Sequence, residues 1–262
     1  MDAKVGFVTQ IGMEYEEAFD VAADLGFDYV ELMMDGPTER RHLDPDAVRT
    51  RASECDIELA VHLPFTLDIG SPFEHVREGA IREIQPAIET ASEFGATKGV
   101  LHASSNAWKP AWNAETVGSN IVESIRILDE FARKRGFEIC VENIPRGWFT
   151  IHDFDRIFDE TAASMTLDTG HARIDGVDSE GMATFVGRHG DRISHFHLND
   201  TRRAKDEHLP FGSGTIDFRT IFAALPDDWG GTLSLEVFTL DYGYIETSKA
   251  NLDEVLRGIE RR

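Results

Sequence analysis

The stretch MTLDTGHARIDG, residues 165–176, is the part of the sequence on which the fold interpretation depends. An apolar run typical of a buried strand ends in Asp168, and Gly170 and His171 follow directly after it. A carboxylate and an imidazole at the end of a strand are typical of a metal site, but they also occur in an ordinary turn with a solvated histidine. The rest of the sequence has to decide between these two interpretations.

Similar short runs alternate with longer amphipathic segments along the chain. Runs rich in β-branched and aromatic residues predict strands, and apolar residues that recur every three to four positions predict helices. The predicted strands are residues 4–8, 29–34, 57–63, 98–103, 138–143, 164–169, 193–198 and 233–238. The predicted helices are residues 15–25, 47–54, 76–94, 114–134, 154–160, 182–189, 218–225 and 252–260. Gly26, Gly95 and Gly136 each follow one of these helices, and we expect them to adopt the left-handed backbone conformation that ends a helix.

Eight strands that are each followed by a helix, with no break in composition, predict an α/β fold. The expected architecture is a (β/α)8 TIM barrel that forms a single domain over residues 1–262. A doubly wound open sheet is the structural alternative. Such a sheet usually carries a glycine-rich phosphate-binding loop after its first strand, but VTQIGMEY, residues 8–15, contains no GxGxxG motif. The barrel is therefore the favoured fold.

The composition restricts the location and the partners of the protein. No apolar run approaches the about 20 residues that span a bilayer, and the N-terminus lacks the pattern of a signal peptide, so we expect a cytoplasmic protein without a membrane partner. Cys55 and Cys140 are isolated and predict neither a disulfide framework nor a thiolate metal site. The net charge of −22 is spread along the chain and is typical of halophilic proteins. It argues only weakly against DNA binding, because concentrated salt would screen it.

Carboxylates and imidazoles gather at the ends of the predicted strands. In a TIM barrel the C-terminal ends of the strands form the active-site face. Nine side chains come from the ends of six predicted strands and the loops after them: His62, His102, Glu142, Asp168, His171, His197, Asp206, His208 and Glu236. Five of the ten histidines of the chain belong to this set. We therefore expect the nine side chains to converge at one mouth of the barrel.

Each of these residues also has an ordinary structural explanation. A histidine at a strand end is more often a hydrogen-bonded loop residue than a ligand, and Asp168 before Gly170 is a common turn former. Glu142 and Glu236 differ, because each interrupts an apolar strand in which an unpaired carboxylate is costly to bury. A divalent metal explains several such groups together. Imidazole and carboxylate ligands without thiolate suit Zn²⁺, Mn²⁺, Co²⁺ or Mg²⁺.

The run ISHFHL, residues 193–198, places two histidines on the same side of a strand. Only the one nearer to the strand end can reach the mouth, so His197 is the expected ligand and His195 belongs to a deeper layer. Asp200, in the sequence HLND, is expected to accept a hydrogen bond from His197 and so to orient its ring.

Seven motifs together give the chain a family resemblance. They are VHLPFTLDIGSP (61–72), VLHASS (100–105), CVENIP (140–145), LDTGHA (167–172), FHLNDTR (196–202), DEHLPFGSGTIDF (206–218) and SLEVF (234–238). With these motifs the chain resembles the xylose isomerase-like TIM barrels. This superfamily joins sugar phosphate isomerases and epimerases to endonuclease IV, the apurinic DNA-repair endonuclease of AP endonuclease family 2. The resemblance runs from the first predicted strand to the last.

The isomerase and epimerase branch implies one divalent metal, held by Glu142, Asp168, His197 and Glu236. The resemblance makes Glu142 and Glu236 the acid and base that move a proton on and off the carbon beside a carbonyl, through a metal-bound enediolate. It also implies that His171 contacts a substrate hydroxyl. A metal-dependent isomerase or epimerase of a small keto-sugar or sugar phosphate is the leading hypothesis.

The endonuclease branch implies instead up to three zinc ions, held by all nine side chains, and DNA as the partner. Phe65 stands where that branch places an aromatic residue that enters the duplex. However, VGFVTQIGMEYEEA, residues 5–18, lacks the glycine-rich opening of endonuclease IV. The basic residues expected near the mouth are also few for a protein that binds phosphates, namely Lys109, Arg146, Arg173, Arg202, Arg203 and Lys205.

The sequence leaves a third functional class open besides the epimerase and the endonuclease. This class is a metal-holding dehydratase or a catalytically silent binding protein. Trp108 and Trp112 follow the strand predicted at residues 98–103, and they either line the substrate cleft or form a subunit contact of a homo-oligomer.

Overall fold

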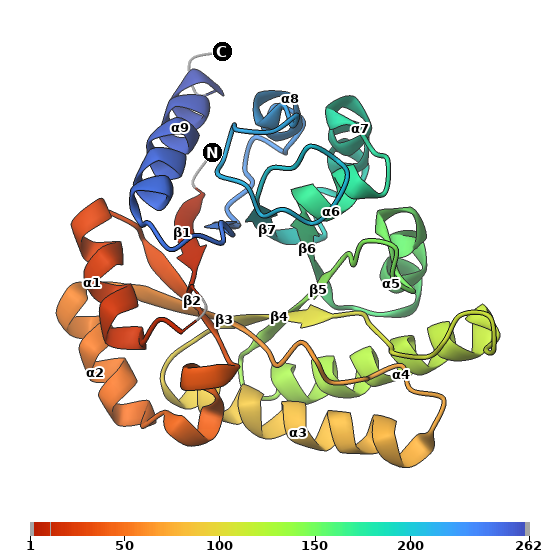
Figure 1. Ribbon diagram of the computed structural model, residues 1–262. Coiled ribbons are helices and arrows are strands. Elements are labelled where there is room, and N and C mark those ends of the chain that lie inside the picture. Colours follow the sequence, from red (N-terminus) through yellow and green to blue (C-terminus); the bar gives the residue numbers. More distant parts are fainter. Residues whose placement is uncertain (1–2, 11, 260–262) are drawn as a thin grey trace.

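The computed structural model describes residues 3–10 and 12–259, in which eight parallel strands close into a barrel (Figure 1). The strands are β1 (Lys4–Val8), β2 (Tyr29–Met33), β3 (Glu58–His62), β4 (Lys98–His102), β5 (Glu138–Glu142), β6 (Ser164–Asp168), β7 (Ile193–Leu198) and β8 (Thr232–Leu235). Neighbours in the barrel are neighbours in the chain, and β8 pairs with β1 to close it. The predicted (β/α)8 TIM barrel is confirmed.

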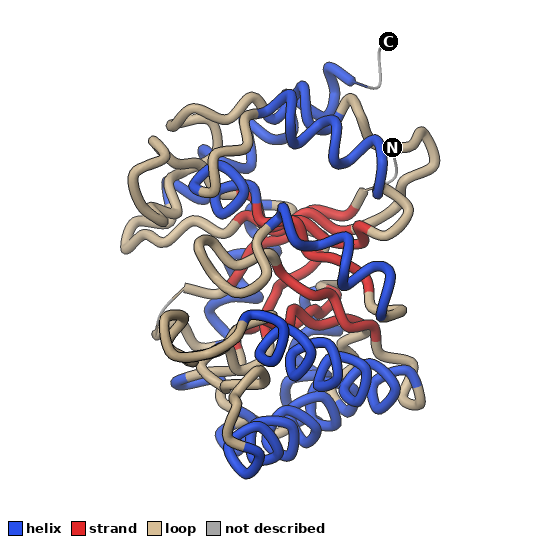
Figure 2. Tube along the Cα trace, turned by 90° about the vertical axis from the view of Figure 1, so that its right-hand side faces the viewer, coloured by secondary structure: helices blue, strands red, loops and turns tan. Residues whose placement is uncertain are grey.

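Helices surround the barrel and connect its strands (Figure 2). The described helices are α1 (Tyr15–Leu25), α2 (Pro45–Cys55), α3 (Glu74–Glu93), α4 (Ala114–Arg133), α5 (Phe154–Glu160), α6 (Thr169–Ile174), α7 (Ser179–His189), α8 (Phe218–Phe222) and α9 (Gly243–Ile259). Short 3₁₀ turns are η1 (Gly36–Thr38), η2 (Arg40–His42) and η3 (Ile151–Asp153). Over residues 3–10 and 12–259, none of the helices combines the length and the hydropathy that crossing a bilayer requires.

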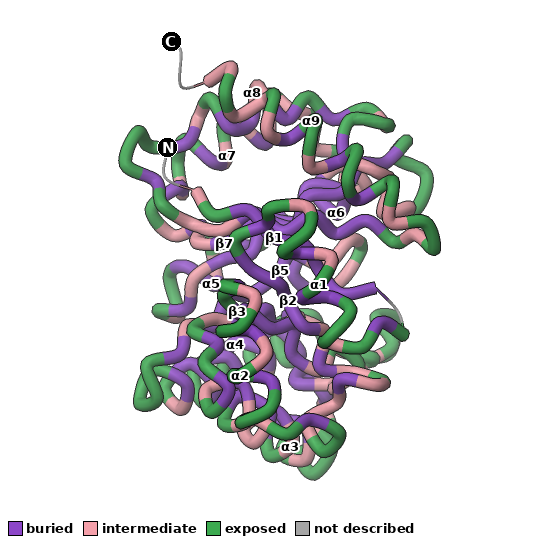
Figure 3. The backbone as a smooth tube through the Cα atoms, turned by 90° about the vertical axis from the view of Figure 1, so that its left-hand side faces the viewer, coloured by how far each residue is buried: buried purple, intermediate pink, exposed green. Residues whose placement is uncertain are grey.

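Apolar side chains from the strands and the helices form the buried core of the protein. Figure 3 shows the strands of the barrel mostly in the colour of buried residues. α4 illustrates why these segments are helical. The side-chain oxygen of Asn113 caps its first turn, and Val117, Ile121, Ile125 and Leu128 recur on one face and are buried. The charged residues of the helix lie on the exposed face, except Asp129, which is buried. A helix with this pattern is stabilised mainly by burying its apolar face against the strands.

The observed elements depart from the predicted ones mainly near the C-terminus. The last helix begins at Gly243 rather than at residue 252. Its predicted end at residue 260 lies outside the described residues, and so do the predicted domain bounds, residues 1 and 262. The apolar period of its first half is hidden because the buried position 248 holds a serine. The Ser248 hydroxyl accepts a hydrogen bond from the backbone N–H of Phe211 at 3.1 Å.

The other observed helix and strand boundaries lie within three residues of the predicted ones. One observed helix was not predicted. Gly26, Gly95 and Gly136 have φ values of 68°, 99° and 69°, which confirms their predicted left-handed conformation. The unpredicted helix, α6, starts directly after β6, where the Asp168 carboxylate accepts a hydrogen bond from the backbone N–H of His171 at 2.6 Å. A six-residue helix is too short to show a period in the sequence.

The register of the barrel brings predicted site residues from different strands side by side. β4 and β5 pair His102 with Glu142, and β6 and β7 pair Asp168 with His197. Because the strands are parallel, their C-terminal ends open on the same face of the barrel. The strand register alone therefore places these four side chains at the same end of the barrel.

Candidate functional site

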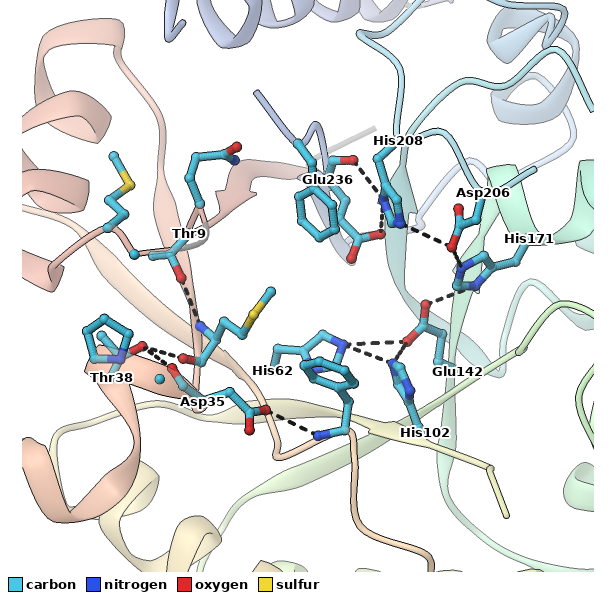
Figure 4. Close-up of a pocket in the computed structure, with 18 residues that line it drawn as sticks. Thr9, Asp35, Thr38, His62, His102, Glu142, His171, Asp206, His208 and Glu236 are labelled. Carbon is cyan, nitrogen blue, oxygen red and sulfur yellow. Dashed lines mark hydrogen bonds and ion pairs between the residues drawn. The ribbon is translucent and has the colours of Figure 1, made fainter. Parts of the chain in front are cut away.

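A cavity of about 370 Å³ opens at the C-terminal ends of the strands (Figure 4). Seven of the nine predicted side chains line it: His62, His102, Glu142, His171, Asp206, His208 and Glu236. The other two, Asp168 and His197, are fully buried beneath its floor. All nine therefore converge on one site.

Four of these residues form a compact group at the floor. Glu142, Asp168, His197 and Glu236 each contribute one donor atom, and the four atoms lie within 4.8 Å of one another. Nδ1 of His197 lies 3.3 Å from Oε1 of Glu142, 3.4 Å from Oε2 of Glu236 and 4.0 Å from Oδ2 of Asp168. We call these four residues the quartet.

The quartet brings three carboxyl groups together in a buried space. Burial, together with repulsion from Glu236 and Glu142, raises the pKa of Asp168 to about 8. Burial would also raise the pKa of Glu236, but the neighbouring His197 and His208 lower it to about 2. Three carboxyl groups and one imidazole in a buried site are a donor set that fits a divalent cation, because such an ion favours the ionised carboxylates. The quartet thus fits such an ion.

Two histidines approach the same glutamate from the opposite wall. Nε2 of His102 lies 2.8 Å from Oε2 of Glu142, and Nε2 of His62 lies 3.6 Å from the same oxygen. The two imidazoles are 3.2 Å apart, measured between their Nε2 atoms. Burial would raise the pKa of Glu142, yet His102 and His197 hold it well below its usual range. Glu142 is therefore ionised and connects the quartet to this histidine pair.

A third group comes from α6 and from the loop after β7. Oδ2 of Asp206 lies 3.0 Å from Nε2 of His171 and 3.1 Å from Nε2 of His208. Although burial lowers the pKa of His208, Glu236 and Asp206 raise it to about 11. His208 has a positive φ of 42°, which is uncommon for a residue other than glycine and is found preferentially at functional sites.

The remaining wall of the cavity is largely apolar. Met13, Met33, Phe65 and Phe238 line it, together with the carboxylate of Asp35. Phe65 packs edge-on against His62 with ring centroids 5.9 Å apart, and Phe238 stacks on His208 at 4.2 Å. This wall could pack against the carbon skeleton of a small molecule.

Within the described part of the chain, no lysine or arginine lines this cavity. Four of the six basic candidates, Lys109, Arg146, Arg173 and Arg202, bond through their side chains to other groups. Arg202 pairs with Glu207 at 2.7 Å, and Lys109 donates a hydrogen bond to the carbonyl oxygen of Arg146 at 3.0 Å. The two tryptophans are not among the lining residues either: Trp108 is 72% exposed, and Trp112 packs edge-on against Phe73.

The expected role of Asp200 is wrong. Its carboxylate accepts hydrogen bonds from the backbone N–H groups of Thr201, Gly214, Thr215 and Ile216, at 2.8–3.2 Å. It therefore holds the loop that precedes α8. Nε2 of His197 points down into the barrel, away from Asp200, and meets Glu31 instead at 3.0 Å.

The sequence reasoning missed three buried polar residues beside the quartet. Glu31 lies in β2, and its signal was the same as that of Glu142, a carboxylate in an apolar strand. It was overlooked because it lies in the middle of the strand. Asn199 donates hydrogen bonds to Oδ2 of Asp168 at 2.8 Å and to Oε2 of Glu236 at 3.3 Å. Asn143 accepts one from the backbone N–H of Asp168 at 2.9 Å.

Comparison with known proteins gives relatives from both branches. An uncharacterized protein of Methanocaldococcus jannaschii is 26% identical over 82% of this chain and 84% of its own. An L-ribulose 3-epimerase of Methylomonas sp. is 24% identical over 83% of this chain and 76% of its own. A probable endonuclease 4 of Natranaerobius thermophilus is 24% identical over 95% of this chain and 93% of its own.

The solved structures and the family models point the same way. The crystal structure of a D-tagatose 3-epimerase-like protein superimposes with a TM-score of 0.86 and 25% identity, covering 98% of each chain. The family model described as xylose isomerase-like TIM barrel matches residues 19–261. The chain therefore belongs to the xylose isomerase-like TIM barrel family.

Proposed function

We propose that the protein is a divalent-metal-dependent epimerase or isomerase of a small, unphosphorylated keto-sugar. The observation that carries this proposal is the quartet, with two glutamates on the floor of a partly apolar cavity. The similarity to an L-ribulose 3-epimerase and to a D-tagatose 3-epimerase-like protein supports the same reaction class.

The quartet would hold the metal through three carboxylate oxygens and the Nδ1 of His197. When bound there, a divalent cation supplies Lewis-acid polarisation of a carbonyl group. Asn199 keeps the carboxylates of Asp168 and Glu236 in place through its two hydrogen bonds. The ring of His197 is fully buried and cannot reorient without breaking its contacts.

The two glutamates would perform the proton transfer. One carboxylate removes the proton from the carbon next to the carbonyl, and the other, once it has taken a proton from solvent, returns that proton to the opposite face of the carbon, which inverts it. The first carboxyl group then releases its proton to solvent. The neighbouring histidines keep Glu142 ionised and therefore able to accept a proton. His171 faces the cavity and would contact a substrate hydroxyl.

The cavity favours an uncharged substrate over a sugar phosphate. Its described lining contains no Lys or Arg side chain, the cationic ring of His208 is already paired with Asp206 and Glu236, and the carboxylate of Asp35 faces the same space. A phosphate is usually bound by such cations or by backbone N–H groups at a helix start. The chain has a net charge of −22, which would further disfavour a dianion at low salt.

A deuterium wash-in assay tests the proposal. The metal-loaded protein is incubated with a panel of ketopentoses and ketohexoses in deuterated water, and carbon-bound deuterium is measured by mass spectrometry. We expect deuterium at the inverted carbon, and a loss of roughly 10²–10⁴-fold in rate for Glu142→Gln and for Glu236→Gln. Glu130→Gln, an exposed site on α4 paired with Lys134, is the matched control and should keep the wild-type rate.

Two outcomes would count against this function. Near-wild-type turnover in either glutamine variant at the active site would remove the proton-transfer roles. Intact metal binding without deuterium uptake from any sugar of the panel would favour a dehydratase or a catalytically silent binding protein.

One observation favours a second candidate, a zinc-dependent endonuclease. Two further groups of potential ligands flank the quartet, His62–His102–Glu142 and His171–Asp206–His208, and a probable endonuclease 4 is among the relatives. Metal content per chain separates the two functions. About one ion supports the epimerase, whereas two or three zinc ions, with incision of abasic-site DNA that is lost in His62→Ala, would support the nuclease.

A further inference from the structure

The interior of the barrel holds a buried carboxylate that the proposed reaction does not use. Glu31 lies in the middle of β2 and is 0% exposed. Its Oε1 lies 3.0 Å from Nε2 of His197, and its Oε2 lies 3.0 Å from Nε2 of His195 and 2.5 Å from the hydroxyl of Ser234. A buried carboxylate with three partners is an unusual feature that requires an explanation.

The directions of these hydrogen bonds follow from the groups present. An ionised carboxylate only accepts, so both histidines and Ser234 must donate to Glu31. The hydroxyl of Ser234 then accepts from Tyr29, which lies 2.8 Å away. Nδ1 of His195 is left as an acceptor, with the hydroxyl of Thr232 at 2.6 Å. Each ring of this layer has a partner for both nitrogens.

The consequence for His197 is that only one of its nitrogens can serve as a ligand. Its Nε2 carries the proton that points to Glu31, so Nδ1, which faces Glu142, Asp168 and Glu236, is the nitrogen that would present a lone pair once a cation replaces its proton. A metal ligand must present such a lone pair, because an N–H cannot coordinate a cation. The other tautomer would direct the Nε2 lone pair at a buried carboxylate and the N–H at the cation.

We infer that Glu31 is a positioning residue that prepares His197 as a ligand by fixing its tautomer and its ring orientation from inside the barrel. This role rests on the proposed function, since it matters only if the quartet binds a metal. Glu31 is not among the residues that line the cavity, and the quartet member that it contacts is His197. Carboxylates that hold a ligand histidine in this way typically contribute 10–100-fold to metal affinity.

The first experiment measures Co²⁺ affinity by titration of the visible absorption of the purified full-length protein. Glu31→Gln keeps the size of the side chain but offers one acceptor oxygen where two histidines need one each. We expect Glu31→Gln to bind Co²⁺ about 10–100-fold more weakly than the wild type. Tyr29→Phe is the matched control, because it removes a hydroxyl of the same buried network and leaves the contact of Glu31 with His197. Its affinity should stay within about 2-fold.

A second measurement is made on the wild type and does not depend on how a substitution at position 31 folds. In the zinc-loaded wild type, ¹⁵N chemical shifts of the histidine rings report which nitrogen of His197 is protonated. We expect a protonated Nε2 and a metal-bound Nδ1. The signals are assigned by their loss in His197→Gln.

The outcomes are distinguishable. Co²⁺ affinity equal to the wild type in Glu31→Gln, or a metal-bound Nε2 in His197, would overturn the inference and leave the proposed function standing. If the wild type bound neither Co²⁺ nor Zn²⁺, the metal-dependent function would itself be wrong, and the inference would fall with it. An equal weakening in Tyr29→Phe would show a general packing effect and would also overturn the positioning role.

Discussion

Gly170 shows how a single missing side chain supports the site. A Cβ at this position would lie 1.8 Å from Oδ1 of Asn199, the residue that holds Asp168 and Glu236. We expect Gly170→Ala to destabilise the protein by about 1–3 kcal/mol, through the overpacking it causes. It should also weaken Co²⁺ binding, because Asn199 must move. Thermal unfolding and the cobalt titration check both effects.

The control for this prediction is Gly187→Ala. Gly187 lies on the exposed side of α7 with no atom near the place of a Cβ, so alanine should leave the melting temperature unchanged or raise it slightly. A Gly170→Ala protein as stable as the control, with wild-type cobalt affinity, would contradict the described packing around Asn199.

At the scale of elements, the lower end of the barrel is held by a polar cluster that spans four strands. Glu138 at the start of β5 accepts from Ser164 of β6 at 2.6 Å and from Ser194 of β7 at 2.9 Å, and it lies 3.4 Å from Nζ of Lys98 in β4. Although burial raises the pKa of Glu138, Lys98 and the two hydroxyls lower it overall. Conservation of this face in TIM barrels is associated with stability, not with catalysis.

The lowered pKa of Glu138 predicts a pH-dependent contribution to stability. A group whose pKa is lower in the folded state stabilises the protein above its unfolded pKa, near 4.3 for an ordinary glutamate, and this contribution is lost as the pH falls through the folded value. We expect Glu138→Gln to lower the melting temperature by roughly a few degrees at neutral pH. The difference from the wild type should shrink below about pH 4.

Glu58→Gln is the control for that series. Glu58 pairs with Lys4 at the same end of the barrel, but the two side chains are 62% and 49% exposed, and exposed pairs contribute little. A difference between wild type and Glu138→Gln that is constant with pH would show that ionisation of Glu138 does not stabilise the cluster.

At the scale of the whole molecule, the net charge of −22 predicts a strong dependence of stability on salt. Like charges on a folded surface repel one another, and this repulsion is screened over about 10 Å at 0.1 M salt and about 3 Å at 1 M. We expect the melting temperature to rise between these concentrations of potassium chloride. Choline chloride should have the same effect if screening is the cause. A melting temperature that stays constant or falls in both salts would contradict the prediction.

Much of the fold could be predicted from local patterns. Apolar runs such as 98–103 and 138–143 mark β4 and β5 because a strand buried on both faces is apolar at nearly every position. The first half of α9 could not be predicted, because buried Ser248 interrupts the apolar period and its partner lies in the loop at Phe211. The helix α6 was missed because it has only six residues.

The sequence by itself determined which side chains gather at the mouth, because strand order and strand ends are local properties and the TIM barrel brings all C-terminal ends to one face. What each of them contacts was decided only by the tertiary structure. Glu31 and His197 are 166 residues apart and meet across the interior of the barrel. Asp200, close in sequence to His197, turns instead to the loop before α8. Sequence distance does not report such contacts, because barrel closure and side-chain direction determine them.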